Sequence, residues 1–174
     1  PFTLSFLMLR SFKDKEPTVG SGVFIADTAL VIGDVEIGED SSIWFGSVLR
    51  GDVNYIRIGA RTNIQDMTMI HVSSKTHATI LEDEITVGHN VTLHGCHVES
   101  RCLIGIGAIL LDGVRVGNNS LVAAGSLLTP GTVIPPRSLV MGSPARVKRE
   151  LTEDEIAYLD RSWRNYVELK EHYR

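Results

Sequence analysis

The sequence predicts an all-β protein, a parallel β-helix followed by one C-terminal α-helix. Two observations predict this fold. Aliphatic residues recur at every sixth position along most of the 174-residue chain, and helical spacing replaces that repeat near residue 153. A period of six matches neither the 3.6-residue period of a helix nor the two-residue alternation of a plain strand. It matches a solenoid in which each hexapeptide supplies one short strand and one turn.

The repeat occupies nineteen positions, and each of them is Ile, Leu or Val. Three hexapeptides close one triangular coil, so nineteen repeats predict about six coils at roughly 4.8 Å per coil. The aliphatic side chains point inward, and the small residue four positions later lies under the corner. This pattern resembles the left-handed hexapeptide-repeat proteins, and the resemblance implies the hand of the coil. The positions are Ile25, Val31, Ile37, Ile43, Leu49, Ile58, Ile64, Ile70, Leu81, Val87, Leu93, Val98, Ile104, Leu110, Val116, Val122, Leu128, Ile134 and Val140.

Two insertions interrupt the repeat. The first adds three residues between Leu49 and Ile58, and the second adds five between Ile70 and Leu81. Insertions in a solenoid usually map to its functional face.

The chain divides into three segments. Residues 1–18 form an N-terminal segment, 19–147 form the β-helix and 148–174 form a helix packed on it. We expect residues 1–7 either to precede a start at Met8 or to add an edge strand. A capping box from Thr152 to Glu155 begins the helix, which we place over 153–171 with its apolar stripe against the β-helix or a neighbouring chain.

Composition excludes several classes of protein. Hydrophobic residues make up 43% of the chain and charged residues 22%, as in a soluble globular protein. The net charge of −4 gives no basic excess for nucleic acid or an anionic membrane. No apolar run approaches the roughly 20 residues of a membrane span. Two cysteines are too few for a disulfide scaffold, which favours a reducing, cytoplasmic compartment.

The repeat arithmetic also brings histidines together. Counting from Ile25 as face one, three aliphatic positions fall on face two of successive coils, and Arg50, His71 and His94 directly follow them. These side chains should stack outward, and two imidazoles one coil apart can share a metal ion. His89, two residues after Val87, lies around a corner on face one, and Asp66 occupies the same position one coil below it. A second chain is therefore needed to add His89, and a ring of three chains closes such a contact.

Other candidate ligands are interpreted as structural. We expect His77, His97 and His172 to be loop or surface residues. Cys96 lies in a metal-like Leu93-His-Gly-Cys-His97 segment, but a buried small thiol is its expected role, as for Cys102.

Several motifs of this chain resemble those of the gamma-class carbonic anhydrase family, and the resemblance covers essentially residues 8–174. The resemblance implies a homotrimer with one metal ion at each subunit interface. It assigns His71 and His94 of one chain and His89 of the next as ligands. The motifs are Ser47-Val-Leu-Arg50-Gly-Asp52, Asn63-Ile-Gln65-Asp66, Ile70-His71, Gly88-His89-Asn90, Leu93-His94-Gly95 and Met141-Gly-Ser-Pro-Ala-Arg146.

The same resemblance assigns supporting roles. Arg50 and Asp52 form an ion pair that supports the interface. Gln65 lies beside the metal with Asp66 next to it, and Tyr166 enters the site from the C-terminal helix. Zinc is the expected metal, and imidazole also suits iron and cobalt. A zinc-bound hydroxide would attack CO2 and release bicarbonate.

One departure from the family concerns proton transfer. The archaeal prototype has a glutamate directly after its Arg-x-Asp and another in an acidic loop. Here Val53 follows Asp52, and the segment 72–79 has no carboxylate. We therefore expect weak turnover, or a proton route through another residue such as His77.

Three other functions fit the repeat. Many hexapeptide-repeat proteins are acyl-CoA acyltransferases that use one histidine as a general base. A thioesterase could use the same metal hydroxide on an acyl-CoA. The third alternative is a non-catalytic trimeric module whose metal is structural.

Overall fold

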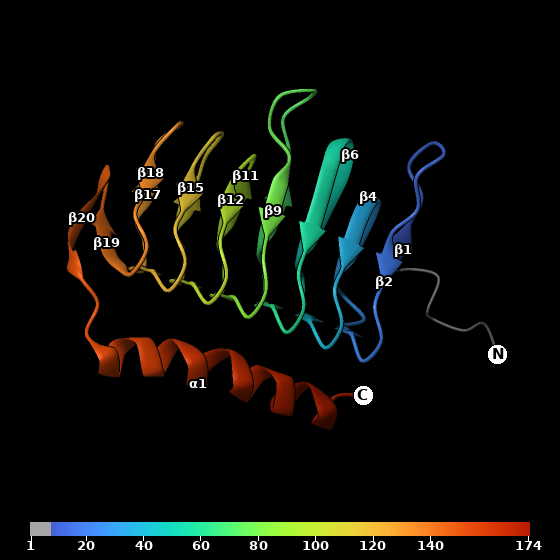
Figure 1. The fold of residues 1–174 in the computed structure, drawn as a ribbon. Helices are drawn as coiled ribbons and strands as arrows, with labels where there is room; N and C mark the ends of the chain where they lie inside the picture. The colour runs from blue at the N-terminus through green and yellow to red at the C-terminus, as the bar shows by residue number, and fades with distance from the viewer. Residues whose placement is uncertain (1–7) are drawn as a thin grey trace.

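The computed structural model describes residues 8–174 and shows a parallel β-helix with one long α-helix beside it (Figure 1). The two interpretations of residues 1–7 lie outside the described residues. No helix in the described part of the chain is long and apolar enough to cross a membrane.

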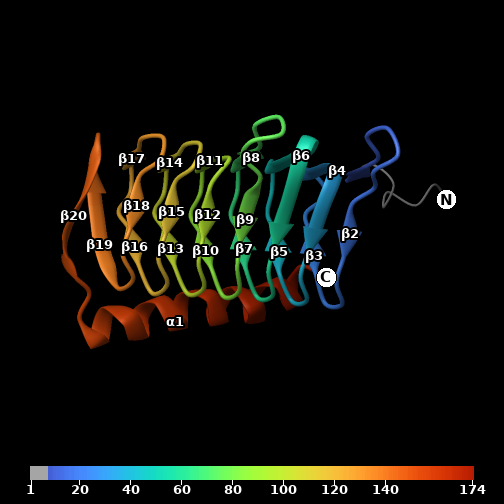
Figure 2. The same cartoon turned by 45° about the horizontal axis from the view of Figure 1, so that its top comes forward.

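The β-helix has three faces. Face one is an eight-stranded sheet that ends in one antiparallel strand. Faces two and three belong to a twelve-stranded sheet, because β4 and β6 run unbroken across the corner between them (Figure 2). Face one contains β3 (Phe24–Ile25), β5 (Ser42–Ile43), β7 (Asn63–Ile64), β10 (Thr86–Val87), β13 (Leu103–Ile104), β16 (Leu121–Val122), β19 (Ser138–Gly142) and β20 (Ala145–Glu150).

The other two faces are built from equally short strands. Face two contains β8 (Met69–His71), β11 (Thr92–His94), β14 (Ile109–Leu110) and β17 (Leu127–Leu128). Face three contains β9 (Thr79–Leu81), β12 (His97–Val98), β15 (Arg115–Val116) and β18 (Val133–Ile134). The corner strands are β4 (Leu30–Ile37) and β6 (Val48–Ile58), and β1 (Leu9–Arg10) and β2 (Thr18–Val19) pair with β4.

The predicted aliphatic ladder forms the core. Every predicted position after Ile25 is at most 4% exposed, and Ile25 is half-buried because it lies in the first coil. Small residues close the corners and satisfy buried backbone groups. Ser47, for example, donates from Oγ to the carbonyl oxygen of Gln65 one coil away, at 2.8 Å. Seven parallel strands on face one correspond to six complete coils and the start of a seventh.

The helix α1 (Glu153–Leu169) lies along face one and runs back toward the first coils (Figures 1 and 2). The predicted capping box is present, since Thr152 and Glu155 bond reciprocally to each other's backbone N–H. A short 3₁₀ turn (Lys170–His172) continues the helix. Leu159 and Trp163 are buried against the β-helix, so the apolar stripe packs on this chain.

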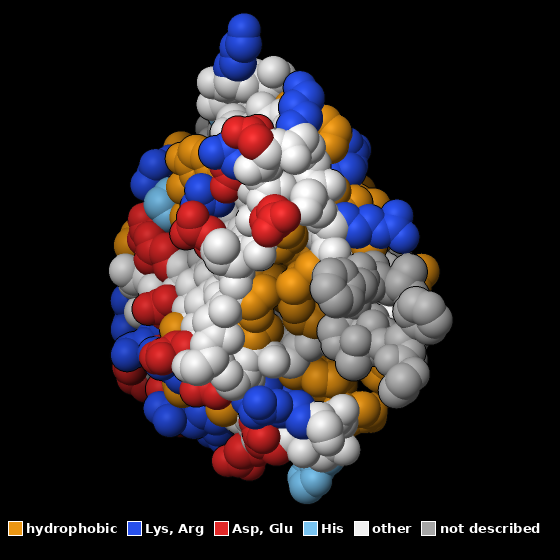
Figure 3. Space-filling view, turned by 90° about the vertical axis from the view of Figure 1, so that its right-hand side faces the viewer, with side chains coloured by type: hydrophobic (Ala, Val, Ile, Leu, Met, Phe, Trp, Pro, Cys, Tyr) orange, Lys and Arg blue, Asp and Glu red, His pale blue; other side chains and the backbone are white. Residues whose placement is uncertain are grey.

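Aromatic and charged contacts hold the C-terminal end of α1. Near its C-terminal end, Tyr166 and Tyr173 pack edge-on against Trp44, with ring centroids 5.4 and 5.1 Å from it. Buried Lys170 pairs with Asp40 at 3.2 Å. These contacts lie at the end of the molecule where the chain begins, and Figure 3 shows apolar side chains gathered in the middle of that end.

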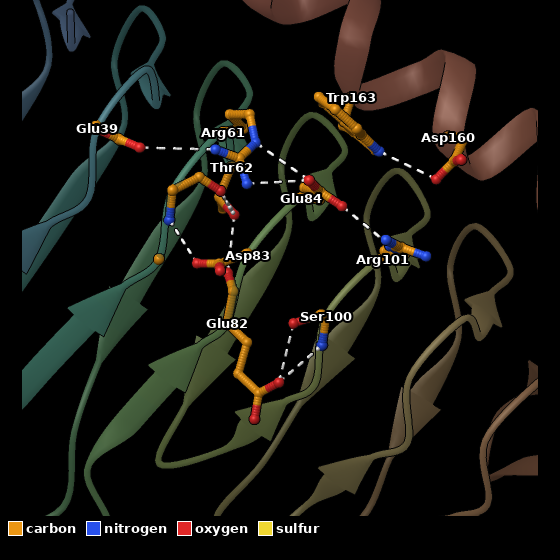
Figure 4. A network of polar contacts seen from close by, with 12 residues as sticks. Glu39, Arg61, Thr62, Glu82, Asp83, Glu84, Ser100, Arg101, Asp160 and Trp163 are labelled. Atoms are coloured by element: carbon orange, nitrogen blue, oxygen red, sulfur yellow. Dashed lines mark hydrogen bonds and ion pairs between the residues drawn. The ribbon is translucent and has the colours of Figure 1, made fainter.

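A row of charged side chains runs beside α1 along four successive coils (Figure 4). Glu39, Arg61, Glu84 and Arg101 alternate in sign, and Arg61 bonds Glu84 at 3.1 Å. The Arg61 guanidinium also lies 6.0 Å from the Trp163 ring. The charged row therefore joins successive coils and supports the buried face of α1.

Strand pairing continues beyond the predicted limits of the β-helix. In residues 8–18, β1 pairs with β4, so this part of the N-terminal segment adds to the first coil. At the other end, β20 folds back on β19 as an antiparallel strand through residue 150. The Ser73–His77 hairpin lies in the second predicted insertion and projects from the coil beside β9 (Figure 1).

Candidate metal centre

Two histidines stack on face two where the repeat arithmetic predicts them. Ile70 pairs with Leu93 and His71 with His94 in the parallel ladder of β8 and β11. The imidazole rings are 5.1 Å apart between centroids, and His71 Nδ1 lies 3.2 Å from His94 Nε2. Two nitrogens bound to one tetrahedral zinc at about 2.0–2.1 Å are about 3.3 Å apart. The pair therefore fits two ligands of one ion.

Each of these histidines bonds an aspartate through its other ring nitrogen. His71 Nε2 lies 2.9 Å from Asp52 Oδ1, and His94 Nδ1 lies 2.7 Å from Asp112 Oδ1. A ligand histidine held by a carboxylate is the usual outer arrangement of a protein zinc site. The donor set thus fits zinc in chemistry as well as in spacing.

The two carboxylates are held in the ionised form. Burial alone would raise the pKa of Asp52, but the hydrogen bond from His71 and the guanidinium of Arg50 hold that pKa below its usual value. Burial opposes the shift at Asp112 too, and hydrogen bonds from Ser73 and His94 lower its pKa. Arg50 forms the predicted ion pair with Asp52.

His89 lies in the turn after β10, at the corner where face one meets the opposite edge of face two. Its Nδ1 is 2.7 Å from Asp66 Oδ2, as expected for residues that occupy the same position one coil apart. The His89 side chain is 46% exposed, which leaves Nε2 available. Within residues 8–174 of one chain, no three His, Cys, Asp or Glu side chains are placed to hold one metal ion.

Gln65 and Tyr166 lie near His89. Gln65 is buried, and its Nε2 donates to Asn63 Oδ1 at 3.1 Å, which leaves the amide oxygen free to accept. Both residues border a groove of about 590 Å³ between α1 and face one. Burial, with the negative charge of Asp66, raises the pKa of Tyr166 above its usual value of 10.

The predicted site residues thus form two groups. We call Arg50, Asp52, His71 and His94 the ladder half, and Gln65, Asp66, His89 and Tyr166 the corner half. The two halves lie at opposite edges of face two of one chain.

The remaining candidates lie outside both halves. Val53 is 47% exposed beside Asp52. His97 bonds Glu82 on face three, and His77 lies in the projecting hairpin. Both cysteines are buried free thiols, and burial raises the pKa of Cys96 to about 12. A buried thiol held protonated is a poor metal ligand.

Asp112 was missed from the sequence. It stands two positions after Leu110, the next aliphatic position on face two, and this register places it one coil beyond Gly95. The same counting that paired His71 with His94 would have found it. Asp112 stands two positions after its aliphatic residue, the same spacing that pairs Asp66 with His89 on face one.

Known proteins resemble this chain along most of its length. The chain matches the family of bacterial transferase hexapeptide proteins (six repeats) over residues 16–51 and 95–130. It is 49% identical to a carbonic anhydrase of Geobacillus kaustophilus, over 96% of this chain and 91% of that protein. It is 50% identical to gamma carbonic anhydrase 2, mitochondrial, of Arabidopsis thaliana, over 92% of this chain, and spans about 60% of that relative's length.

Solved structures share the fold. A Bacillus cereus protein described as a putative acetyltransferase, the product of the BC4754 gene, is 46% identical with a TM-score of 0.94, and the match covers 96% of each chain. Parallel coils and the hexapeptide repeat define a left-handed β-helix protein, which confirms the predicted fold class. Within that class, the chain belongs to the gamma carbonic anhydrase family.

Proposed function

We propose that this protein is a zinc-dependent carbonic anhydrase that works as a homotrimer and interconverts CO2 and bicarbonate. One observation supports the proposal above all. The His71–His94 pair has the spacing and the carboxylate partners of a zinc site, while His89 lies at the other edge of face two with its own aspartate. A second copy that brings its corner half to the ladder half would supply the third imidazole.

The residues around this site have separable tasks. His71, His94 and the next chain's His89 would hold the metal. A three-imidazole zinc site supplies the ionisation of a water molecule near neutral pH. The Gln65 amide oxygen would accept a hydrogen bond from that water and orient it. The Tyr166 hydroxyl would donate to substrate from the rim of the groove, and the Arg50–Asp52 pair would hold His71.

The direct test combines metal content, assembly and activity. The purified chain should hold about one zinc per subunit, sediment as a trimer and hydrate CO2 in a stopped-flow indicator assay. His94→Ala should lose metal and activity while keeping its β-sheet circular dichroism. The matched control is His97→Ala, which removes a carboxylate-bonded histidine from face three. A zinc-loaded trimer with no CO2 hydration at any buffer concentration would contradict the proposal.

The groove beside the corner half supports a second candidate, hydrolysis or transfer of an acyl thioester. Its volume of about 590 Å³ far exceeds what CO2 needs and falls in the range of organic-ligand pockets. Leu103 and Leu121 contribute to an apolar wall, and Arg161 adds a positive charge for an anionic group. Turnover of acetyl-CoA by a zinc-loaded protein that does not hydrate CO2 would favour this function.

A further inference from the structure

Asp112 is the carboxylate that lies within hydrogen-bond distance of His94. One oxygen, Oδ1, lies 2.7 Å from His94 Nδ1, and the other, Oδ2, accepts a hydrogen bond from Ser73 Oγ at 2.5 Å. The carboxylate is thus held from both sides, by a hydroxyl on one oxygen and by an imidazole on the other.

The backbone beside His94 leaves space for this carboxylate. Gly95 has a φ of +61°, and a Cβ placed there would lie 2.2 Å from Asp112 Oδ1. Any side chain at position 95 would therefore displace Asp112 as well as strain the turn.

Both insertions that interrupt the repeat support Ser73. Asn54, in the first insertion, donates from Nδ2 to the Ser73 carbonyl oxygen at 3.0 Å. Within the second insertion, the Ser73 N–H donates to the His77 carbonyl oxygen at 2.9 Å. The extra residues thus fix the backbone that presents the Ser73 hydroxyl to Asp112.

The hydrogen bond between Asp112 and His94 determines which ring nitrogen of His94 carries the proton. An ionised carboxylate only accepts hydrogen bonds, so Nδ1 of His94 must carry its ring proton. Nε2 then has its lone pair free and faces His71 Nδ1. We propose that Asp112, held by Ser73, is a positioning residue that fixes the tautomer and the ring orientation of His94 for metal binding. This inference rests on the proposed metal site.

Zinc affinity is the first test, measured by competition with a chromophoric chelator on the full-length protein. Asp112→Ala should weaken zinc binding about 10- to 100-fold, the usual effect of losing such a partner. Glu82→Ala is the matched control, because Glu82 bonds His97 at 2.9 Å on face three, and it should leave zinc affinity unchanged. Equal zinc affinity in Asp112→Ala and the unaltered protein would overturn the proposal.

The second test needs no metal. Nitrogen-15 NMR of the metal-free protein should show His94 protonated at Nδ1 in the unaltered chain and a mixture of tautomers in Asp112→Ala. Asp112→Asn should keep the tautomer, since its amide oxygen still accepts. Ser73→Ala should weaken zinc binding, and Ser73→Thr, which retains the hydroxyl, should restore it.

These readouts separate the two proposals. If the unaltered protein binds zinc and the tautomer is the same in all variants, the role of Asp112 is wrong and the metal site stands. If the unaltered protein binds no zinc while the tautomer changes in Asp112→Ala, the metal function is wrong and Asp112 still orients His94.

Discussion

Each of the three candidate ligand histidines bonds its own aspartate, His71 to Asp52, His94 to Asp112 and His89 to Asp66. The partner of a metal ligand fixes which ring nitrogen is free. His97 on face three also bonds a carboxylate, that of Glu82, so the carboxylate alone does not mark a ligand. His71 and His94 differ from it because their ring nitrogens lie 3.2 Å apart.

Sequence counting predicted one of these three pairs, His89 with Asp66, and also the contact between His71 and His94. The register of six placed His71 beside His94 and Asp66 beside His89, because stacked coils make equivalent positions neighbours. It could not predict the hydrogen bond between Ser73 and Asp112, which depends on how the projecting hairpin folds back. Inserted residues have no repeat to fix their place.

Val53 allows a test of proton transfer at the scale of one side chain. We expect slow CO2 hydration that rises with imidazole buffer, because external buffer replaces a missing proton carrier. Val53→Glu should raise turnover and reduce this buffer dependence. Val53 is 47% exposed and adjoins Asp52, and a general acid or base within reach contributes roughly 10²–10⁴-fold when proton transfer limits the rate.

The control for this variant is Val133→Glu, which adds the same carboxylate to an exposed position on face three. Its turnover should match the unaltered protein. Fast turnover that is insensitive to buffer in the unaltered protein would show that a residue already present moves the proton.

At the scale of the element, one strand tests the alternation of inward and outward residues. In β18, Ile134 is 4% exposed and its neighbour Val133 is 67% exposed. Ile134→Ala should lower the free energy of unfolding by about 2–5 kcal/mol, because it leaves a cavity inside the coil. Val133→Ala should change it by less than about 0.5 kcal/mol. Chemical denaturation compares the two, and equal losses would contradict the inward register.

The beginning of α1 should be sensitive to acid. The guanidinium of Arg149, with the backbone N–H of Thr152, lowers the pKa of Glu155 from 4.5 to about 2. Because the folded pKa is the lower one, this stabilisation is complete above pH 4.5 and is lost as the pH falls toward 2.

Glu155→Gln should therefore lower the urea midpoint at pH 6 and have little effect near pH 2.5, with unfolding followed by tryptophan fluorescence. Glu168→Gln, an exposed residue later in the same helix, is the control and should show a small effect at both values. A constant difference between Glu155→Gln and the unaltered protein at every pH would mean that the charge has no role.

The helices and strands that the sequence predicted are those marked by a regular sequence pattern. The capping box predicted α1 to within two residues, and the hexapeptides predicted the strands, because both signals repeat or stand at fixed offsets. The antiparallel β20 was missed. Its only buried residue is Ala145, so it has no apolar pattern to read. Its place depends on the open edge of the last coil, which needs a partner strand.

At the scale of the whole molecule, the two halves of the site favour assembly. Met67, Met69, Ile106 and Ile109 are exposed apolar side chains in β8, β14 and the turns before them, along the face that links the halves. A second copy packed there would cover them and bring a corner half to a ladder half. Sequence arithmetic predicted this need for a second chain, because it placed His89 away from the other two histidines.

Mixed assemblies test whether each site is shared between chains. In a ring of three, every site would take His71 and His94 from one chain and His89 from the next. A His89→Ala chain and a His71→Ala chain should each be inactive alone. A mixed ring of either composition contains one place where an intact pair meets an intact His89, so it regains one site in three.

Co-expression of the two variants at equal levels should therefore restore about one quarter of the zinc content and activity of the unaltered protein, since about three quarters of random trimers are mixed. Co-expressing His71→Ala with His94→Ala is the control, because both changes damage the same half and no ring regains a site. Restoration in the first mixture alone requires ligands from two chains. If neither mixture recovers zinc while trimers still form, all the ligands belong to one chain, and the shared site is wrong.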